Sequence, residues 1–216
     1  MRNTLLAGAT ALATVLFAGS AMATDFSFSG FLDADDDVQF FNFQVGTTSN
    51  VTLLTYSYAG GTQADGNLII EGGFDPILAL FDSSGTLINS NDDGSASDVG
   101  TSAVTGSTFD TFLTATLGAG TYTVAVMQYD NFPSGSSLSD GFTYSGQPNF
   151  TAGYGCSNGQ FCDVDGFNRS AFWAFDVLNV DDAVVVDPSP VPLPAGMPLL
   201  LGALGAMGIA RRRKKT

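Results

Sequence analysis

Residues 110–130 read DTFLTATLGAGTYTVAVMQYD, and this stretch decides the fold class. Two runs rich in Thr, Val, Leu and aromatic residues, 110–117 and 121–129, flank the short segment Gly118–Gly120. Runs of this length and composition, bounded by Gly, Asn, Asp and Pro, are typical of β-strands. We therefore predict two strands joined by a tight hairpin connection at Gly118–Gly120.

The same pattern recurs along the chain. Segments 25–32, 38–45, 50–58 and 170–180 alternate apolar and polar residues, and 76–82 is a short apolar run. Side chains two residues apart lie on one face of a strand. The pattern therefore groups Phe26 with Phe28, Phe41 with Phe43 and Val45, and Trp173 with Phe175 and Val177. Seven or more short strands, without helical periodicity between residue 24 and the tail, imply an all-β fold, an antiparallel β-sandwich.

The segment FDSSGTL, residues 81–87, predicts a hairpin turn. Asp82 can accept hydrogen bonds from the backbone N–H groups that follow it, and Gly85 can adopt positive φ. Gly120 before Thr121 fits the same explanation. These are structural roles, so we do not interpret the motifs as catalytic.

The N-terminal 23 residues have the three-part pattern of a secretory signal peptide. Arg2 is followed by an apolar run from Leu5 to Ala18, and small residues stand at Ala21 and Ala23. A buried core helix is disfavoured, because the run begins at residue 5 and stops at an A-x-A-like site. We predict a signal helix over 1–23, with cleavage after Ala23.

Acidic residues dominate the segment 24–190. It carries all 21 acids and one base, Arg169, so its formal charge is 1 − 21 = −20. Such a surface repels phosphate backbones, which excludes nucleic acid as a partner. It also suits divalent cations, and general solubility is the alternative reason for so many acids.

The exported segment also lacks most catalytic side chains. The chain has no His, and residues 24–190 have no Lys. This removes His-assisted nucleophiles, Ser-Lys dyads and His-ligated zinc. A hydrolase with two facing carboxylates stays open, but no stretch singles out such a pair. We therefore predict that the chain is not an enzyme.

The C-terminal tail contains an apolar segment followed by basic residues. The 20 residues 191–210 carry no charge, and Arg211–Lys215 are all basic. A membrane-spanning helix needs about 20 apolar residues, and Lys and Arg remain cytoplasmic. We predict a C-terminal transmembrane helix that begins near Pro198. The predicted organisation is a signal peptide over 1–23, a β-sandwich over 24–180, a linker over 181–190 and a sorting segment over 191–216.

The tail resembles a known sorting signal. The motif Val191, Pro192, Leu193, Pro194 and Ala195 matches the VPLPA variant of the PEP-CTERM family, which places a short apolar helix and a basic cluster after it. The resemblance implies recognition by an exosortase-type membrane protease in a Gram-negative bacterium. The chain would be anchored in the inner membrane before processing. It would then be transferred to the cell surface or the exopolysaccharide matrix.

The middle of the chain resembles a second family. Segments 35–45, 74–94 and 110–130 follow the order of motifs in the bacterial pre-peptidase C-terminal domain, a jelly-roll-like sandwich. The matching positions are Leu78, Leu80, Asp82, Gly85, Gly120 and Tyr122. That family usually accompanies an enzyme domain, which has no counterpart here. The insertion 132–169 also lies outside its pattern.

Cys156 and Cys162 are predicted to form a disulfide. Both would lie outside the inner membrane, where disulfides persist, and the Gly between them allows bridging geometry. Two free thiols are the alternative.

Three stretches offer clustered oxygen ligands for calcium, which prefers six to eight of them. They are Asp33, Asp35, Asp36 and Asp37; Asn89, Asn91, Asp92 and Asp93; and Asp163, Asp165 and Asn168. The third begins like an EF-hand loop but lacks the final Glu and the flanking helices. Acidic turns are the alternative at each stretch, because Asp and Asn bond their own backbone.

Aromatic residues of the insertion suggest carbohydrate binding. Exposed rings on a β-sandwich stack on sugars, and the insertion offers Phe132, Phe142, Tyr144, Phe150 and Tyr154. The alternative is that these rings cover the core. We predict a non-enzymatic surface or matrix protein, and a carbohydrate- or exopolysaccharide-binding module is the alternative.

Overall fold

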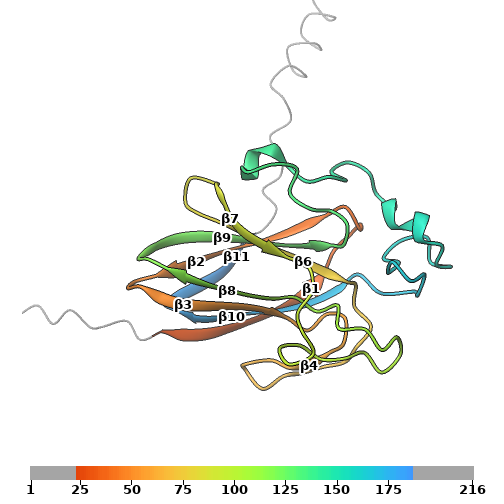
Figure 1. Cartoon of the computed structure of the whole chain (residues 1–216), viewed down its shortest axis with the longest axis horizontal. Coiled ribbons are helices and arrows are strands. Elements are labelled where there is room, and N and C mark those ends of the chain that lie inside the picture. The colour runs from red at the N-terminus through yellow and green to blue at the C-terminus, as the bar shows by residue number, and fades with distance from the viewer. Residues whose placement is uncertain (1–22, 187–216) are drawn as a thin grey trace, which may run out of the picture.

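The computed structural model describes residues 23–186, and it shows two antiparallel sheets packed face to face (Figure 1). The strands are β1 (Thr24–Phe31), β2 (Val38–Val45), β3 (Ser49–Thr55), β4 (Gly61–Thr62), β5 (Leu68–Ile69), β6 (Pro76–Phe81), β7 (Leu87–Asn91), β8 (Phe112–Leu117), β9 (Gly120–Gln128), β10 (Phe172–Val180) and β11 (Asp182–Val186). Two short 3₁₀-helices, η1 (Leu138–Asp140) and η2 (Phe150–Tyr154), lie in the insertion. The predicted all-β sandwich is confirmed.

The strand order is that of a jelly roll. One sheet has the order β1-β10-β3-β8, and the other has the order β11-β2-β9-β6-β7. Without β11, the two sheets are the four-stranded halves of a jelly roll. Strands β4 and β5 form a separate hairpin. Strands that follow one another in the sequence therefore mostly lie in different sheets. Strands that pair within a sheet are mostly far apart in the sequence.

The alternating residues form the core between the sheets. Phe41, Phe43, Trp173, Phe175 and Val177 are all buried in one cluster, as their spacing predicts. The Phe41 ring lies at its centre, 5.4 Å from the Trp173 ring and 4.9 Å from the Phe175 ring. Aromatic pairs at these distances contribute beyond their buried area.

Strand β6 is buried on both faces. Leu78 and Leu80 belong to the main core, whereas Ile77, Ala79 and Phe81 pack on the outer side in a second cluster. The insertion covers that outer side: its residues Phe132, Leu138 and Phe142 belong to the second cluster. Figure 1 shows the insertion, in green to cyan, outside the five-stranded sheet. A fully buried strand therefore reads as an unbroken apolar run.

The predicted hairpin at Gly118–Gly120 is wrong. Strand β8 pairs with β3, whereas β9 pairs with β2 and β6, so this connection crosses from one sheet to the other. The Tyr122 hydroxyl donates to the Gly118 carbonyl at 2.9 Å. A Tyr that bonds backward to the backbone at a crossing between sheets is the tyrosine corner of β-sandwiches. Apolar alternation specifies the buried face of a strand but not its partner.

The predicted linker also begins too early. Residues 182–186 form β11, which pairs with β2 over Asp182–Val186. Asn179, the penultimate residue of β10, adopts a positive φ of 66°, and Ala183 in β11 packs against the core. Residues 187–190 lie outside the described part of the chain, as do the predicted signal peptide before Ala23 and the sorting segment 191–216. Within residues 23–186, no helix has the length and apolar character needed to cross a membrane.

The hairpin predicted at residues 81–87 is confirmed. Strands β6 and β7 pair across it, and Gly85 has a φ of 81°. One oxygen of Asp82 accepts hydrogen bonds from the Ser84 and Thr86 N–H groups at 2.8 and 2.9 Å. These bonds lower the pKa of Asp82, with the Ser84 hydroxyl contributing most. The acid is therefore a turn residue.

We expect Phe41→Ala to lower the free energy of unfolding by about 3–5 kcal/mol, because it leaves a cavity in the core. Urea unfolding followed by the fluorescence of Trp173, the only Trp in the chain, would measure this loss. Leu68→Ala is the control, since Leu68 is 75% exposed and should change stability by less than about 0.5 kcal/mol. Equal effects of the two substitutions would contradict the placement of Phe41.

Candidate functional site

One end of the sandwich contains a buried polar cluster around Arg169. This side chain is 6% exposed, and its guanidinium carbon lies 3.5 Å from the centroid of the Tyr58 ring. Its Nε donates to the Gly73 carbonyl at 3.0 Å, and its Nη2 donates to the Tyr58 carbonyl at 2.6 Å. A cation over an aromatic face is attracted by the ring quadrupole, and more strongly when desolvated. Arg169 therefore joins the insertion to the loops after β3 and before β6.

The predicted calcium ligand Asp163 belongs to this cluster. Its Oδ2 accepts a hydrogen bond from the Tyr58 hydroxyl at 2.7 Å. Its Oδ1 accepts from the N–H groups of Asp165 and Phe167 at 3.0 and 2.9 Å. Asp165 is exposed, and Asn168 bonds the Ser157 hydroxyl. Both oxygens of Asp163 thus have partners within the chain, which is the geometry of an acidic turn.

The stretch Asp33–Asp37 is a turn that holds the insertion. Asp35 is fully buried, and its Oδ1 accepts from the Asn149 N–H at 2.6 Å. Its Oδ2 accepts from the N–H and the hydroxyl of Thr151. Asp37 accepts from the Ala34 N–H at 2.7 Å and closes the turn. The carboxylates of Asp35 and Asp37 therefore position backbone, whereas Asp33 is exposed and Asp36 is half-buried.

The stretch Asn89–Asp93 closes the edge between the two sheets. Asn91 Nδ2 donates to the carbonyls of Asp93 and Phe112 at 2.7 and 2.9 Å. Thr111 Oγ1 donates to the Asp92 carbonyl at 2.7 Å. Partial burial and the neighbouring Asp92 raise the pKa of Asp93 to about 6. The carboxylates of this stretch are thus less engaged by backbone than those of Asp35 and Asp163.

Asp75 is a buried acid that the sequence analysis missed. It is 2% exposed, and its Oδ1 accepts no hydrogen bond from the described residues. Burial, and then the charges of Asp93 and Asp92, raise its pKa well above the ordinary value. Its position before Pro76 is typical of a turn, so no sequence signal indicated burial. An uncharged carboxyl at this depth avoids the free-energy cost of an isolated buried charge.

These positions do not gather into one site. Among residues 23–186, no group of three or more acidic, Cys or His side chains is arranged to hold a metal ion. The three predicted stretches lie in separate turns, and two of them use their carboxylates as backbone acceptors. Calcium binding at these stretches stays a prediction.

The predicted disulfide between Cys156 and Cys162 is confirmed, with 5.4 Å between the two Cα atoms. Cys162 is fully buried, and its N–H donates to the Thr151 hydroxyl. Thr151 is also the partner of Asp35. The bridge therefore stiffens the loop that the acidic turn holds against the sandwich.

The aromatic residues of the insertion pack on one another and on the sheet. The rings of Tyr144 and Phe150 stack at 4.0 Å and 6°. Phe142 is buried beside Phe40, and Phe132 lies 5.9 Å from the Tyr129 ring. All five predicted sugar-binding rings, including Tyr154, are buried or half-buried. These contacts agree with the alternative that the rings cover the fold.

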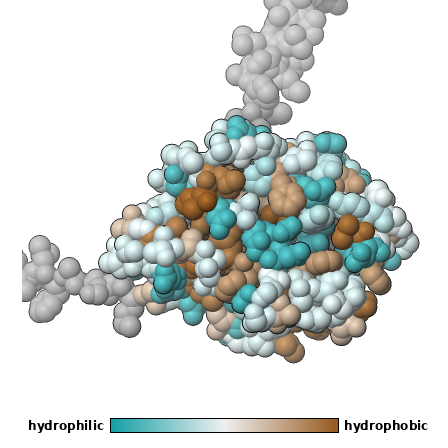
Figure 2. All heavy atoms as spheres, in the orientation of Figure 1, coloured by the Kyte–Doolittle hydropathy of each residue, from teal (hydrophilic) through white to brown (hydrophobic). Residues whose placement is uncertain are grey.

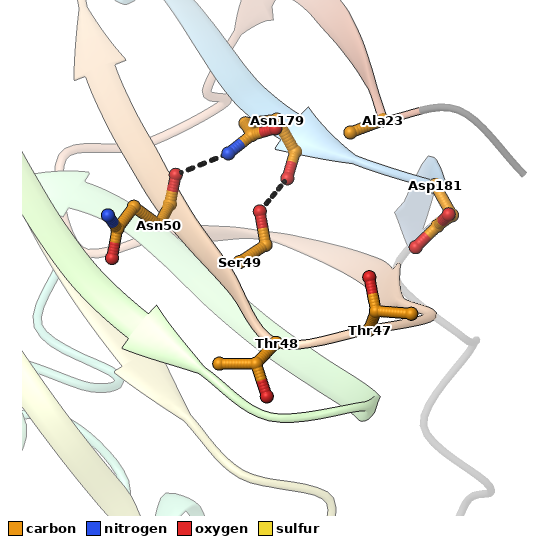
Figure 3. Close-up of a pocket in the computed structure, with 7 residues that line it drawn as sticks. All are labelled: Ala23, Thr47, Thr48, Ser49, Asn50, Asn179 and Asp181. Atoms are coloured by element: carbon orange, nitrogen blue, oxygen red, sulfur yellow. Dashed lines mark hydrogen bonds between the residues drawn. The ribbon is translucent and has the colours of Figure 1, made fainter.

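A polar pocket lies at the other end of the sandwich, near the start of β1 (Figure 3). It has a volume of about 360 Å³ and is lined by Ala23, Thr47, Thr48, Ser49, Asn50, Asn179 and Asp181. Asn179 Nδ2 donates to the Asn50 carbonyl at 2.8 Å, and the Ser49 hydroxyl donates to the Asn179 carbonyl at 2.9 Å. Asp181 accepts from the Gly46 N–H. The pocket offers hydroxyl, amide and carboxylate groups but no aromatic ring. These groups favour polar contacts with a ligand.

Comparison with known proteins finds no family model that matches the chain and no similar curated protein. Both resemblances described above therefore stay predictions.

We expect no free thiols in the denatured protein isolated without reductant and two after reduction, because Cys156 and Cys162 are bridged. Titration with a thiol reagent, with and without a reductant, measures both values. Reduction should lower the free energy of unfolding by about 2 kcal/mol, since the closed loop is short. Two thiols before reduction would contradict the bridge.

We expect Asp93→Asn to stabilise the protein at pH 7.5 but not at pH 3.5. The folded state keeps the Asp93 proton up to a pH of about 6, whereas the unfolded chain loses it near 4. This group therefore makes the folded state less stable as the pH rises between these values. The gain at pH 7.5 should be about 1 kcal/mol, because solvent screens the group. Urea unfolding in the presence of a chelator measures it, and equal changes at both pH values would refute the assignment.

Proposed function

We propose that this chain is a non-enzymatic protein of the cell surface or extracellular matrix, delivered by an exosortase-type sorting protease. The order of the sequence motifs at its two termini is the observation that carries the proposal. A signal peptide pattern opens the chain, and Val191–Ala195, an uncharged segment and the cluster Arg211–Lys215 close it. This order exports the domain and holds it at the inner membrane with the basic cluster in the cytoplasm.

The end of the folded domain supports this proposal. Strand β11 ends at Val186, and the motif begins at Val191, so residues 187–190 are the whole connection. The two prolines in this connection, Pro188 and Pro190, favour an extended chain. A membrane protease would then meet the motif close to the sandwich.

The disulfide supports an oxidising compartment. Bridges between cysteines persist in exported proteins and are rare in the cytosol. The Cys156–Cys162 bridge lies in a loop that Asp35 also holds, so it belongs to the folded domain.

The buried acids support a structural function. Asp110 accepts from the Thr55 hydroxyl and from the N–H groups of Tyr58 and Ala59. Asp176 accepts from the Gln63 amide and the Ala64 N–H. Carboxylates with two occupied oxygens order loops, whereas a hydrolase needs a facing pair free to reach substrate.

The sorting motif can be tested with paired proline substitutions. We expect the surface form of the wild-type protein to end between Val191 and Gly196, as measured by mass spectrometry. Pro192→Ala with Pro194→Ala should keep the basic cluster and leave most of the protein in the inner membrane. Pro188→Ala with Pro190→Ala is the matched control outside the motif, and it should be processed like the wild type.

Recovery of an intact Arg211–Lys215 cluster from the surface form would refute the sorting proposal. Equal processing of the motif variant and the control would refute the role of the motif. Both readouts are independent of any ligand that the domain binds.

A further inference from the structure

A second pocket lies at the corner where β1 passes into β2. It has a volume of about 260 Å³ and is lined by Phe31, Leu32, Asp33, Asp37, Val38 and Gln39. Phe31 stands out among them, because 71% of its surface is exposed. A ligand that covered this ring would remove apolar area from water, which is favourable.

The Phe31 ring keeps an open face. It contacts Phe172 in an edge arrangement, with 5.3 Å between the centroids and 65° between the planes. In such a pair, the partner ring covers at most one face of Phe31. The other face is then open to solvent, in agreement with the large exposed fraction. Figure 2 shows the strongly hydrophobic residues as small separate areas on the face in view, which is the usual distribution for a soluble surface.

Three polar residues line the pocket together with Phe31. Asp33 is exposed, and Asp37 and Gln39 line the same pocket. Gln39 Nε2 donates to the carbonyls of Phe40 and Val186 at 3.0 and 3.2 Å, which fixes the orientation of the amide. Carboxylates are strong acceptors for hydroxyl groups, because the hydrogen bond is charge-assisted. The pocket thus combines an exposed aromatic ring with carboxylate and amide side chains in its lining.

The loop that forms the pocket is held in place. Asp35 is bonded to Asn149 and Thr151, and the Asp36 carbonyl accepts from Asn131 Nδ2 at 3.1 Å. The Leu32 N–H donates to the Ala171 carbonyl at 3.0 Å. A fixed loop loses little conformational entropy when a ligand binds. Asp35, predicted as a metal ligand, therefore acts here by positioning its neighbours.

We propose that this pocket binds a hexose unit of a neutral polysaccharide. The C–H face of a pyranose ring is weakly positive and suits the negative face of the Phe31 ring. Its hydroxyls would donate to Asp33 and Asp37. The two carboxylates, in a domain with a large negative charge, disfavour uronic acids, sulfates and phosphates. Neither the stacked insertion rings nor the polar pocket near Ala23 combines an open ring with acceptors.

This inference rests on the proposed function, since it names the matrix component that a surface protein would meet. The test uses the full chain in a zwitterionic detergent without sugar groups. The protein is run in native gels that contain an α-glucan, a β-glucan, a galactomannan or alginate. Retardation as a function of polymer concentration gives a dissociation constant for each. We expect at least one neutral polymer, and not alginate, to retard the wild-type protein.

Three variants locate the site. Phe31→Ala should weaken binding at least tenfold without changing the melting temperature, because the ring is exposed. Phe31→Trp should keep binding, because it keeps an aromatic face. Phe167→Ala removes another exposed ring, 41% exposed, and should bind like the wild type.

The proposal is overturned if no neutral polymer retards the protein, or if alginate retards it equally. It is also overturned if Phe31→Ala and Phe167→Ala have the same effect. None of these results changes the C-terminus of the surface form, so failure of the sugar site and failure of the sorting proposal are distinguishable.

Discussion

Arg169 places a positive charge inside a domain whose other charged side chains, from residue 24 to 186, are all acidic. It lies where three backbone segments meet closely. A Cβ atom on Gly73 would lie 2.3 Å from the Phe172 carbonyl oxygen and 2.5 Å from that of Ser57, so only glycine fits there. Arg169 donates to the carbonyls of Gly73 and Tyr58 at this junction. A buried cation is tolerated here because two carbonyls and an aromatic face replace part of its hydration.

Four buried acids also hold loops of the domain in place. Asp35, Asp110, Asp163 and Asp176 each accept hydrogen bonds from loops, and these loops include the insertion and the connections at the ends of the sheets. Asp is suited to this role because its short side chain reaches neighbouring N–H groups. These long segments of residues 23–186 are thereby ordered with only two short 3₁₀-helices. The acidic composition is therefore largely a property of its turns, although the exposed acids still determine the surface charge.

The sequence predicted which face of a strand is buried better than it predicted which strand pairs with which. The alternation of Phe41, Phe43 and Val45 identified the buried side of β2, because side-chain direction follows the period of the strand. The crossing at Gly118–Gly120 was predicted as a hairpin, because a short glycine-rich turn fits both a hairpin and a crossing between sheets. Which strands pair is determined by contacts between residues far apart in the sequence. Strand β11 was assigned to a linker, since its partner β2 lies far away in the sequence. The buried Asp75 and the exposed Phe31 were also missed, because burial of a single residue depends on the assembled fold.

The burial of Arg169 bears on the resistance of the folded domain to proteolysis. Between residues 24 and 186 it is the only Lys or Arg, so a protease that cuts after basic residues has one candidate bond, Arg169–Ser170. That bond becomes accessible when this end of the sandwich opens, and cleavage then follows the population of the open state. The folded domain should thus resist trypsin-like enzymes for as long as this end stays closed. The lack of lysine also leaves no side-chain amine on it for enzymes or reagents that modify this group.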